Sequence, residues 1–156
     1  LFCGTGTIGQ IIASQIPTAQ VIGVDIVESA IANAKKNATK NGLNEIKWFA
    51  ADVGKFLSEY PNYKGGIDTV ILDPPRAGIA PKTLQKVIAL GANRLIYVSC
   101  NPATQARDIA VLSSNGYELV KFSLVDQFPH TGHIESIGVF KKVTLELDEN
   151  SSTFIP

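Results

Sequence analysis

Residue types that mark several protein classes are scarce in this chain of 156 residues. It has only two cysteines, Cys3 and Cys100, which excludes the disulfide framework of a small secreted domain. Two histidines and the absence of a Cys-x-x-Cys pair leave too few ligands for a typical structural zinc site. We therefore expect reduced thiols and no bound metal.

Long hydrophobic runs and net charge are also missing. No apolar run approaches the ~18 residues that span a bilayer, and no basic segment of the secretory type opens the chain. We therefore expect a cytoplasmic protein that does not enter a membrane. The formal net charge is zero, whereas a domain that binds nucleic acid without help is usually basic.

The residues that are present suit one soluble domain with a sizeable core. Hydrophobic residues make up 45% of the chain and charged residues 18%, as in ordinary globular proteins. We expect this domain to cover residues 1–147 and the polar residues 148–156 to form a frayed tail. Leu1 to Cys3 are typical of the end of a buried strand. The first strand is therefore expected to be truncated, with a portion that grips a partner lying upstream. The sequence does not indicate an oligomeric state.

Short apolar runs alternate with amphipathic stretches along the chain, which predicts βαβ units and a parallel sheet. The predicted fold is a doubly wound α/β sheet, mostly parallel, with an antiparallel strand pair at its C-terminal end. Ligands bind such sheets at the carboxyl ends of their strands. The expected strands are 21–24, 46–50, 69–72, 95–98, 117–125 and 134–141, and the expected helices are 8–15, 28–40, 53–60, 81–89 and 104–113.

A glycine-rich turn follows the first strand. The G-x-G-x-x-G run from Gly4 to Gly9, with Gly6 between them, permits a tight turn and close approach of a ligand to the backbone. Asp25 ends the next strand about 20 residues later, the spacing of an acid that binds ribose hydroxyls. Together they predict an adenosine site, and both NAD and S-adenosylmethionine remain possible. Asp52, after the third strand, either accepts from an adenine amino group or caps the following helix.

A rigid acidic turn follows the fourth strand. Its sequence is Asp73-Pro74-Pro75-Arg76, and two consecutive prolines fix the backbone and end the strand. We expect this turn to hold Asp73 and Pro74 where a planar base meets a methyl donor. Arg76 either contacts a phosphate or anchors its own turn.

Cys100 differs from Cys3, which we expect to be an ordinary buried thiol. It follows the fifth strand in the polar turn Ser99-Cys100-Asn101-Pro102. That turn lies at the same sheet edge as the glycine turn and Asp73. A cysteine at this edge is placed as a catalytic nucleophile, with Asn101 beside it as a candidate substrate contact.

Four motifs in this order make the chain resemble the RNA uridine-C5 methyltransferases that act on tRNA and ribosomal RNA. The resemblance extends to about Lys142 and is specific because all four motifs occur. They are Leu1-Phe2-Cys3-Gly4-Thr5-Gly6-Thr7, Asp73-Pro74-Pro75-Arg76-Ala77-Gly78, Ser99-Cys100-Asn101-Pro102 followed by Ala106-Arg107-Asp108, and Asp126-Gln127-Phe128-Pro129-His130-Thr131-Gly132-His133-Ile134-Glu135.

The resemblance implies a Rossmann-like class I methyltransferase with S-adenosyl-L-methionine as cofactor and tRNA or rRNA as substrate. It implies that Cys100 is the nucleophile and Glu135 the general base. The residues that match the family's cofactor contacts are Phe2, Thr7, Asp25 and Asp73. Bacterial relatives commonly have asparagine at the position of Thr7, and the family has an upstream glutamine and RNA-binding portion that this chain does not contain.

Three other functions remain open at this point. A NAD-dependent dehydrogenase would explain the glycine turn but not the Asp73 and Cys100 turns. An enzyme that methylates an amino group of adenine or cytosine would explain Asp-Pro-Pro but would need no thiol. The third is an inactive domain that binds cofactor or RNA.

Several polar residues are assigned structural roles. His130 and His133 are interpreted as residues that shape their loop. Arg107 and Asp108 are expected to form an ion pair of small value on a helix surface. The lysines of the helix 28–40 are interpreted as a solvated face, with an RNA-facing patch as the alternative.

Overall fold

The computed structural model of the chain describes residues 1–126, 130 and 134–143. The tail expected at 148–156 lies outside the described residues. The elements, in chain order, are α1 (Thr7–Gln15), β1 (Ile22–Asp25), α2 (Glu28–Lys40), β2 (Lys47–Ala50), α3 (Val53–Glu59), the 3-10 turn η1 (Pro61–Tyr63), β3 (Thr69–Leu72), α4 (Pro81–Ala89), β4 (Arg94–Ser99), α5 (Pro102–Ser114), β5 (Tyr117–Val125) and β6 (Glu135–Lys142).

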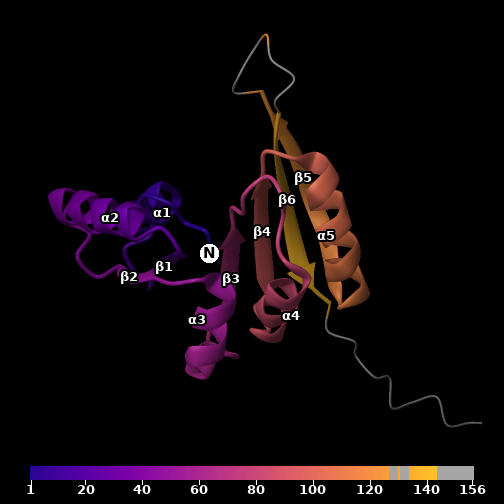
Figure 1. Cartoon of the computed structure of the whole chain (residues 1–156), viewed down its shortest axis with the longest axis horizontal. Coiled ribbons are helices and arrows are strands. Elements are labelled where there is room, and N and C mark those ends of the chain that lie inside the picture. Colours follow the sequence, from indigo (N-terminus) through magenta and orange to yellow (C-terminus); the bar gives the residue numbers. More distant parts are fainter. Residues whose placement is uncertain (127–129, 131–133, 144–156) are drawn as a thin grey trace, which may run out of the picture.

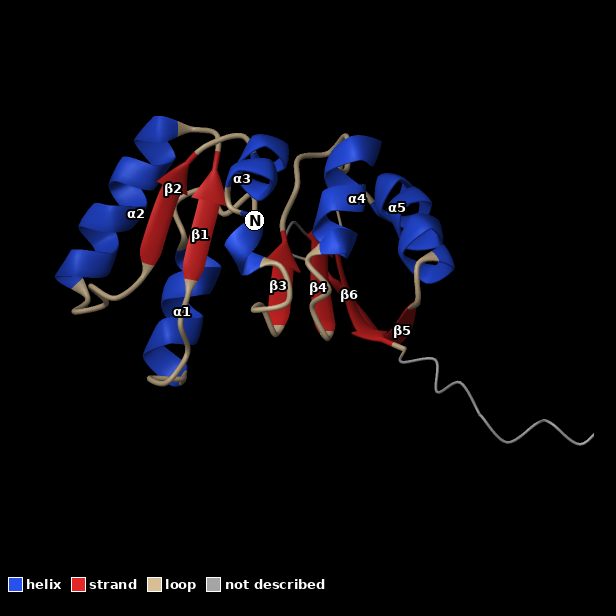
Figure 2. Ribbon diagram, turned by 90° about the horizontal axis from the view of Figure 1, so that it is seen from below, coloured by secondary structure: helices blue, strands red, loops and turns tan. Residues whose placement is uncertain are grey.

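The strands form two hydrogen-bonded groups that the first residues of the chain connect. β1 pairs with β2 in parallel, and the second group has the order β3-β4-β6-β5. The Cys3 amide donates to the Val24 carbonyl at 3.1 Å, and the backbone nitrogen of Leu1 donates to the Ile71 carbonyl at 2.8 Å. The N-terminus accordingly lies between the two groups in Figures 1 and 2. The order across the molecule is thus β2-β1, residues 1–3, then β3-β4-β6-β5.

The last two strands are antiparallel to each other, as the sequence predicts, and of the two only β6 runs against β3 and β4. β3 and β4 are parallel, whereas β6 is antiparallel to β4 on one side and to β5 on the other. The antiparallel pair therefore has its later member inside the sheet and its earlier member, β5, at the edge. The doubly wound α/β fold with a closing antiparallel pair is confirmed.

Helix boundaries follow local sequence signals. α2 begins and ends where the sequence predicts, with Ile31, Ala34 and Ala38 buried on one side and its lysines exposed on the other. α5 begins two residues before the predicted start. Its first residue is Pro102, a residue favoured at this position, and the Asn101 side chain caps the helix by accepting from the Ala103 amide at 3.2 Å.

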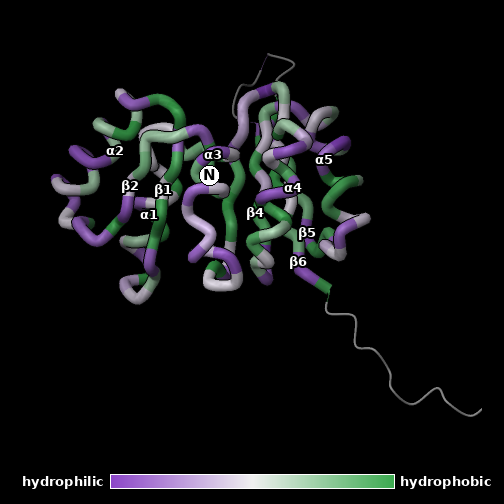
Figure 3. The backbone as a smooth tube through the Cα atoms, turned by 60° about the horizontal axis from the view of Figure 1, so that its bottom comes forward, coloured by the Kyte–Doolittle hydropathy of each residue, from purple (hydrophilic) through white to green (hydrophobic). Residues whose placement is uncertain are grey.

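The main core lies between the β3-β4-β6-β5 strands and the helices α4 and α5. In Figure 2, α3, α4 and α5 follow one another along one side of these strands, and α1 and α2 accompany β1 and β2. Figure 3 shows the strands at the centre of the molecule as mainly hydrophobic segments. The core cluster consists of Val70, Leu72, Ile79, Leu84, Val87, Leu90, Ala92, Leu95, Tyr97, Leu112, Tyr117 and Phe140.

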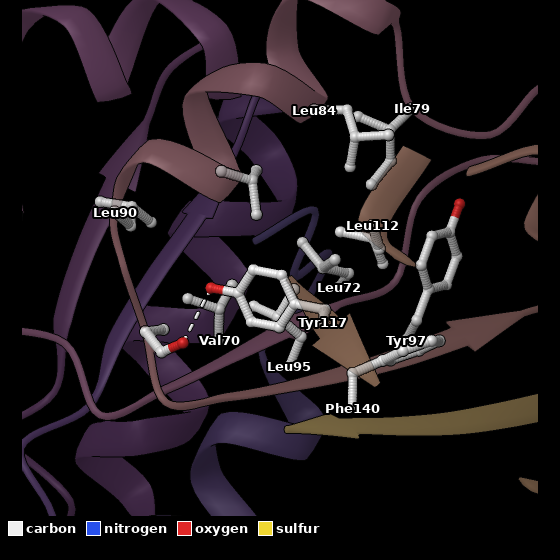
Figure 4. Packing of buried hydrophobic residues seen from close by; sticks show 12 residues of the cluster. Val70, Leu72, Ile79, Leu84, Leu90, Leu95, Tyr97, Leu112, Tyr117 and Phe140 are labelled. Carbon is white, nitrogen blue, oxygen red and sulfur yellow. Dashed lines mark hydrogen bonds between the residues drawn. The ribbon is translucent and has the colours of Figure 1, made fainter. Parts of the chain in front are cut away.

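Polar atoms within this core have partners. The Tyr117 hydroxyl donates to the Ala92 carbonyl at 2.8 Å, the dashed line in Figure 4. Within the described residues, no buried side-chain nitrogen or oxygen lacks a hydrogen-bond partner. None of the helices described is both long and apolar enough to cross a membrane.

Candidate active site

Four predicted site residues gather at one edge of the molecule because of strand direction. Asp25 ends β1, Asp73 follows β3 and Cys100 follows β4, so all three lie at carboxyl ends of parallel strands. Glu135 begins β6, which runs the opposite way, and β6 pairs with β4 as far as Ser99 opposite Ser136. Cys100 is the next residue after this pair on β4, and Glu135 is the residue before it on β6. The thiol and the carboxylate therefore lie at neighbouring positions of the same edge.

Asp25 holds the glycine turn in place. One oxygen of its carboxylate accepts the Gly4 amide at 2.8 Å, and the other accepts the Val27 amide at 2.9 Å. Gly4 and Gly6 have φ values of 52° and 76°, the left-handed region that glycine adopts readily. A Cβ atom built on Gly4 would meet nothing within 4 Å, so the backbone there is open to a ligand.

Trp48 supports the glycine turn from β2, which the sequence analysis did not foresee. A Cβ atom on Gly6 or Gly23 would collide with the Trp48 ring. Gly23 is the register partner of Trp48 across the β1-β2 pair. The indole therefore occupies the space that side chains at these two positions would need. A glycine inside an apolar strand was the available signal, because it often marks a close approach.

Phe2, Cys3 and Thr7 lie around the same turn. Phe2 is half-buried, packs against both core clusters and has a φ of 58°, which is unusual for a residue other than glycine. Cys3 is half-buried rather than fully buried, and desolvation raises the pKa of its thiol to about 11. Thr7 is exposed as the first residue of α1.

Asp52 caps α3. Its carboxylate accepts the Lys55 amide at 2.9 Å, and its side chain is exposed. The capping role that the sequence allowed is therefore present. Its other predicted role, a contact with an adenine amino group, stays a prediction.

The Asp73 turn is bonded to the Cys100 turn. The Arg76 carbonyl accepts from the Asn101 side-chain amide and from the Thr104 hydroxyl, each at 3.0 Å. Pro74 is buried beneath the turn. Asp73 is exposed by surface area, but its surroundings displace part of its hydration, and this desolvation raises the pKa of Asp73 above its usual value.

Asp108 corrects one prediction, because the ion pair with Arg107 is not confined to a helix surface. Asp108 is 2% exposed and accepts from the Tyr97 hydroxyl at 2.7 Å and the Ile79 amide at 2.9 Å. Arg107 bonds the same carboxylate through Nη2 at 2.7 Å and also donates to the carbonyls of Ala77 and Ile79. One buried carboxylate thus joins β4, α5 and the end of the Asp73 turn.

The Cys100 turn is closed by its own neighbours. The Ser99 hydroxyl accepts a hydrogen bond from the Asn101 backbone amide at 3.0 Å and donates one to the Asn101 carbonyl at 3.1 Å. These bonds join the residues on either side of Cys100. Cys100 is half-buried and carries a free thiol. Glu135 is also half-buried.

The remaining predicted residues are placed as follows. His130 is exposed with a φ of 76°, whereas His133 lies outside the described residues. Arg76 is exposed. In the part of the chain that the structure describes, no group of three or more His, Cys, Asp or Glu is arranged to hold a metal ion.

Comparison with protein families gives a match over nearly the whole chain. The family model described as tRNA (uracil-5-)-methyltransferase matches residues 1–143. An uncharacterized RNA methyltransferase of Clostridium acetobutylicum is 42% identical over 142 residues, which cover 91% of this chain and 30% of that protein. The 23S rRNA (uracil(1939)-C(5))-methyltransferase of Acinetobacter baumannii is 42% identical over 144 residues, covering 92% and 31%. The chain thus spans about a third of the length of the curated relatives it matches.

Solved structures agree with the fold. The tRNA (uracil-54, C5)-methyltransferase of Pyrococcus abyssi, in complex with S-adenosyl-L-homocysteine, superposes with a TM-score of 0.73 and 32% identity over 89% of this chain and 32% of that chain. The precorrin-6y C5,15-methyltransferase of Geobacter metallireducens has a TM-score of 0.72 at 13% identity, covers 91% of this chain and 77% of that chain, and supports the fold alone.

Proposed function

We propose, because the chain belongs to the tRNA (uracil-5-)-methyltransferase family, that it transfers a methyl group from S-adenosylmethionine to carbon 5 of a uridine in RNA. The observation that carries this proposal is the placement of Cys100 directly after β4 and of Glu135 at the start of β6, both next to the Ser99–Ser136 pair. This edge also carries the glycine turn. The same membership favours methyl transfer over the dehydrogenase that the glycine turn alone allowed.

The residues of the glycine turn fit the proposed cofactor. The backbone at Gly4 is open, so an adenosine can approach it closely. Each Asp25 oxygen accepts one amide from the protein, and a carboxylate oxygen has a second lone pair that can accept a ribose hydroxyl. Phe2 and Thr7 flank this turn, and Asp52 and Asp73 follow the strands on either side.

The nucleophile and the base act on different atoms of the pyrimidine ring. The Cys100 thiolate adds to carbon 6, and the electron pair of the C5–C6 double bond moves toward carbon 5 and the neighbouring carbonyl. When bound, the sulfonium cofactor supplies the methyl group that carbon 5 then takes up. Glu135 removes the proton from carbon 5. The electrons of that C–H bond restore the double bond while the C–S bond breaks and the thiolate leaves.

The linked Asp73 and Cys100 turns suit the binding of a single base. Asp73, Pro74, Arg76 and Asn101 are the proposed substrate contacts, and the bonds from Asn101 and Thr104 to the Arg76 carbonyl fix the two turns to each other. A uridine within folded RNA must leave its stack to reach Cys100. Because the chain spans about a third of its relatives, we assign it this chemistry and not the choice of a particular RNA.

A covalent trap tests the proposal in the full-length protein. RNA that carries 5-fluorouridine should give a methylated adduct that survives denaturation and maps to Cys100, because fluorine cannot leave as a proton. Cys100→Ala should abolish the adduct, whereas the matched Cys3→Ala variant should retain it. Methyl transfer to carbon 5 by Cys100→Ala at the parent rate would refute the covalent mechanism.

A further inference from the structure

A buried polar cluster lies directly beneath the Cys100 and Glu135 positions. Gln105 on α5 is 1% exposed and Ser136 on β6 is fully buried. The Gln105 side-chain amide donates to the Tyr97 carbonyl at 2.9 Å and to the Ser136 carbonyl at 3.4 Å. This single side chain therefore bonds the backbones of β4 and β6 at their shared end.

The Ser136 hydroxyl completes the cluster from the other side. It lies 2.7 Å from the Gln105 side-chain oxygen and 3.2 Å from the Ser99 carbonyl, so its one proton is shared between two acceptors. Ser136 directly follows Glu135 in the sequence, and Ser99 directly precedes Cys100. The cluster thus holds the two residues that flank the nucleophile and the base.

Packing alone does not require these polar groups. A leucine at position 105 would occupy a similar volume without needing partners, and buried amides are tolerated only when their hydrogen bonds are made. The cluster lies at and near the ends of β4 and β6 beside Cys100 and Glu135, and its innermost acceptor is the Tyr97 carbonyl, two residues before the end of β4. Such a satisfied network restricts the relative position of the groups that it joins.

We propose that Gln105 and Ser136 are positioning residues, which set the separation between the Cys100 sulfur and the Glu135 carboxylate. The catalytic consequence rests on the proposed function, since only methyl transfer gives the two groups a common substrate. Small misplacements of reacting groups can cost about 100-fold in rate. The positioning itself is a property of the fold and can be measured without any reaction.

The first experiment measures this position by disulfide formation. In a Cys3→Ala background, Glu135→Cys gives a second thiol at the position facing Cys100, where paired antiparallel residues have Cα atoms about 4.5–5.5 Å apart, within the range that a disulfide spans. Equilibration in glutathione buffers yields the effective concentration of one thiol toward the other. We expect Gln105→Leu and Ser136→Ala to lower it at least tenfold.

Matched variants separate positioning from general stability. Tyr117→Phe removes another buried hydrogen bond of the same sheet, between the Tyr117 hydroxyl and the Ala92 carbonyl, and should leave the effective concentration within twofold of the parent. Ser136→Thr keeps the hydroxyl and should restore most of it. Equal losses in Tyr117→Phe and Gln105→Leu would overturn the proposal, as would a parent protein in which the disulfide does not form.

The second experiment measures methyl transfer by the full-length protein with Cys3, Cys100 and Glu135 intact. Gln105→Leu should lower kcat at least tenfold, leave the KM for S-adenosylmethionine within twofold and retain a cooperative unfolding transition. An unchanged kcat would overturn the catalytic consequence. If the parent protein transfers no methyl group, the proposed function fails, and the disulfide measurement still decides whether Gln105 and Ser136 position the two residues.

Discussion

Replacing Asp108 with alanine should strongly destabilise the protein. The Asp108 carboxylate accepts from the Tyr97 hydroxyl at 2.7 Å, the Ile79 amide at 2.9 Å and the Arg107 Nε at 2.9 Å. Alanine removes all of these acceptors at once. The three donors belong to β4, to the residue that follows the Asp73 turn, and to α5.

The size of the effect follows from which donors can reach water. Tyr97 is fully buried and Ile79 is 2% exposed, so both donors stay unpaired in the variant. A buried donor without a partner costs about 1–3 kcal/mol, which gives a loss of about 2–6 kcal/mol in the free energy of unfolding. The Arg107 side chain is 52% exposed and regains water, so it adds little.

Two milder variants set an expected order. Asp108→Asn keeps one carbonyl oxygen as an acceptor and should cost less than alanine. Tyr97→Phe leaves the carboxylate with its other donors and should cost about 1 kcal/mol. Asp68→Ala changes an exposed aspartate and should stay within about 0.5 kcal/mol of the parent.

Equilibrium unfolding in urea, followed by circular dichroism, measures all four variants under one set of conditions. A loss below about 1 kcal/mol for Asp108→Ala would contradict the reasoning, because it would mean that the unpaired donors find other partners. A larger loss for Tyr97→Phe than for Asp108→Ala would contradict it as well.

Three further predictions concern the glycine turn and the residues next to it. Gly23→Ala should lower the free energy of unfolding in urea by at least about 2 kcal/mol, because the added methyl group meets the Trp48 ring. A second substitution, Trp48→Leu, should relieve part of that loss. The control Gly66→Ala should be tolerated, because the added methyl group there meets only ordinary contacts. Alkylation of Cys3 requires the thiolate, which is about one part in a thousand at pH 8 for a pKa of about 11. Its rate, read by mass spectrometry, should therefore rise about tenfold per pH unit up to about pH 11, and a plateau below pH 9 would argue against the burial of this thiol. Asp25→Ala releases the Gly4 amide and should weaken S-adenosylhomocysteine binding at least tenfold by calorimetry, whereas unchanged affinity would remove Asp25 from the proposed cofactor site.

The sequence was sufficient to predict the sheet edge at which the site lies. Apolar runs marked the strands, and the polar turns at Asp73 and Cys100 marked their carboxyl ends. The antiparallel pairing of the last two strands with each other was also predicted, whereas the place of β6 beside β4, which brings Glu135 to the Cys100 end, comes from the structure. The predicted features depend on short-range patterns, which a single sequence displays directly.

The supporting contacts could not be predicted in the same way. Asp108 follows an arginine on a helix, so the sequence suggested an exposed pair, and only the packing of α5 against the Asp73 turn buries it. Gln105 is an uncharged polar residue in a helix with mixed faces, a pattern that does not separate solvent from a buried cluster. The place of Trp48 under Gly23 depends on the register of two strands that are 21 residues apart at their nearest ends.

The position of β6 between β4 and β5 has a consequence during synthesis on the ribosome. β5 emerges first, but it pairs only with β6 among the described strands, so it has no place in the sheet until the last strand has left the exit tunnel. Until then β4 presents an unpaired edge, which invites pairing with other chains. A transcript that ends before residue 135 would therefore encode the whole glycine turn and yet yield a nascent product prone to aggregate.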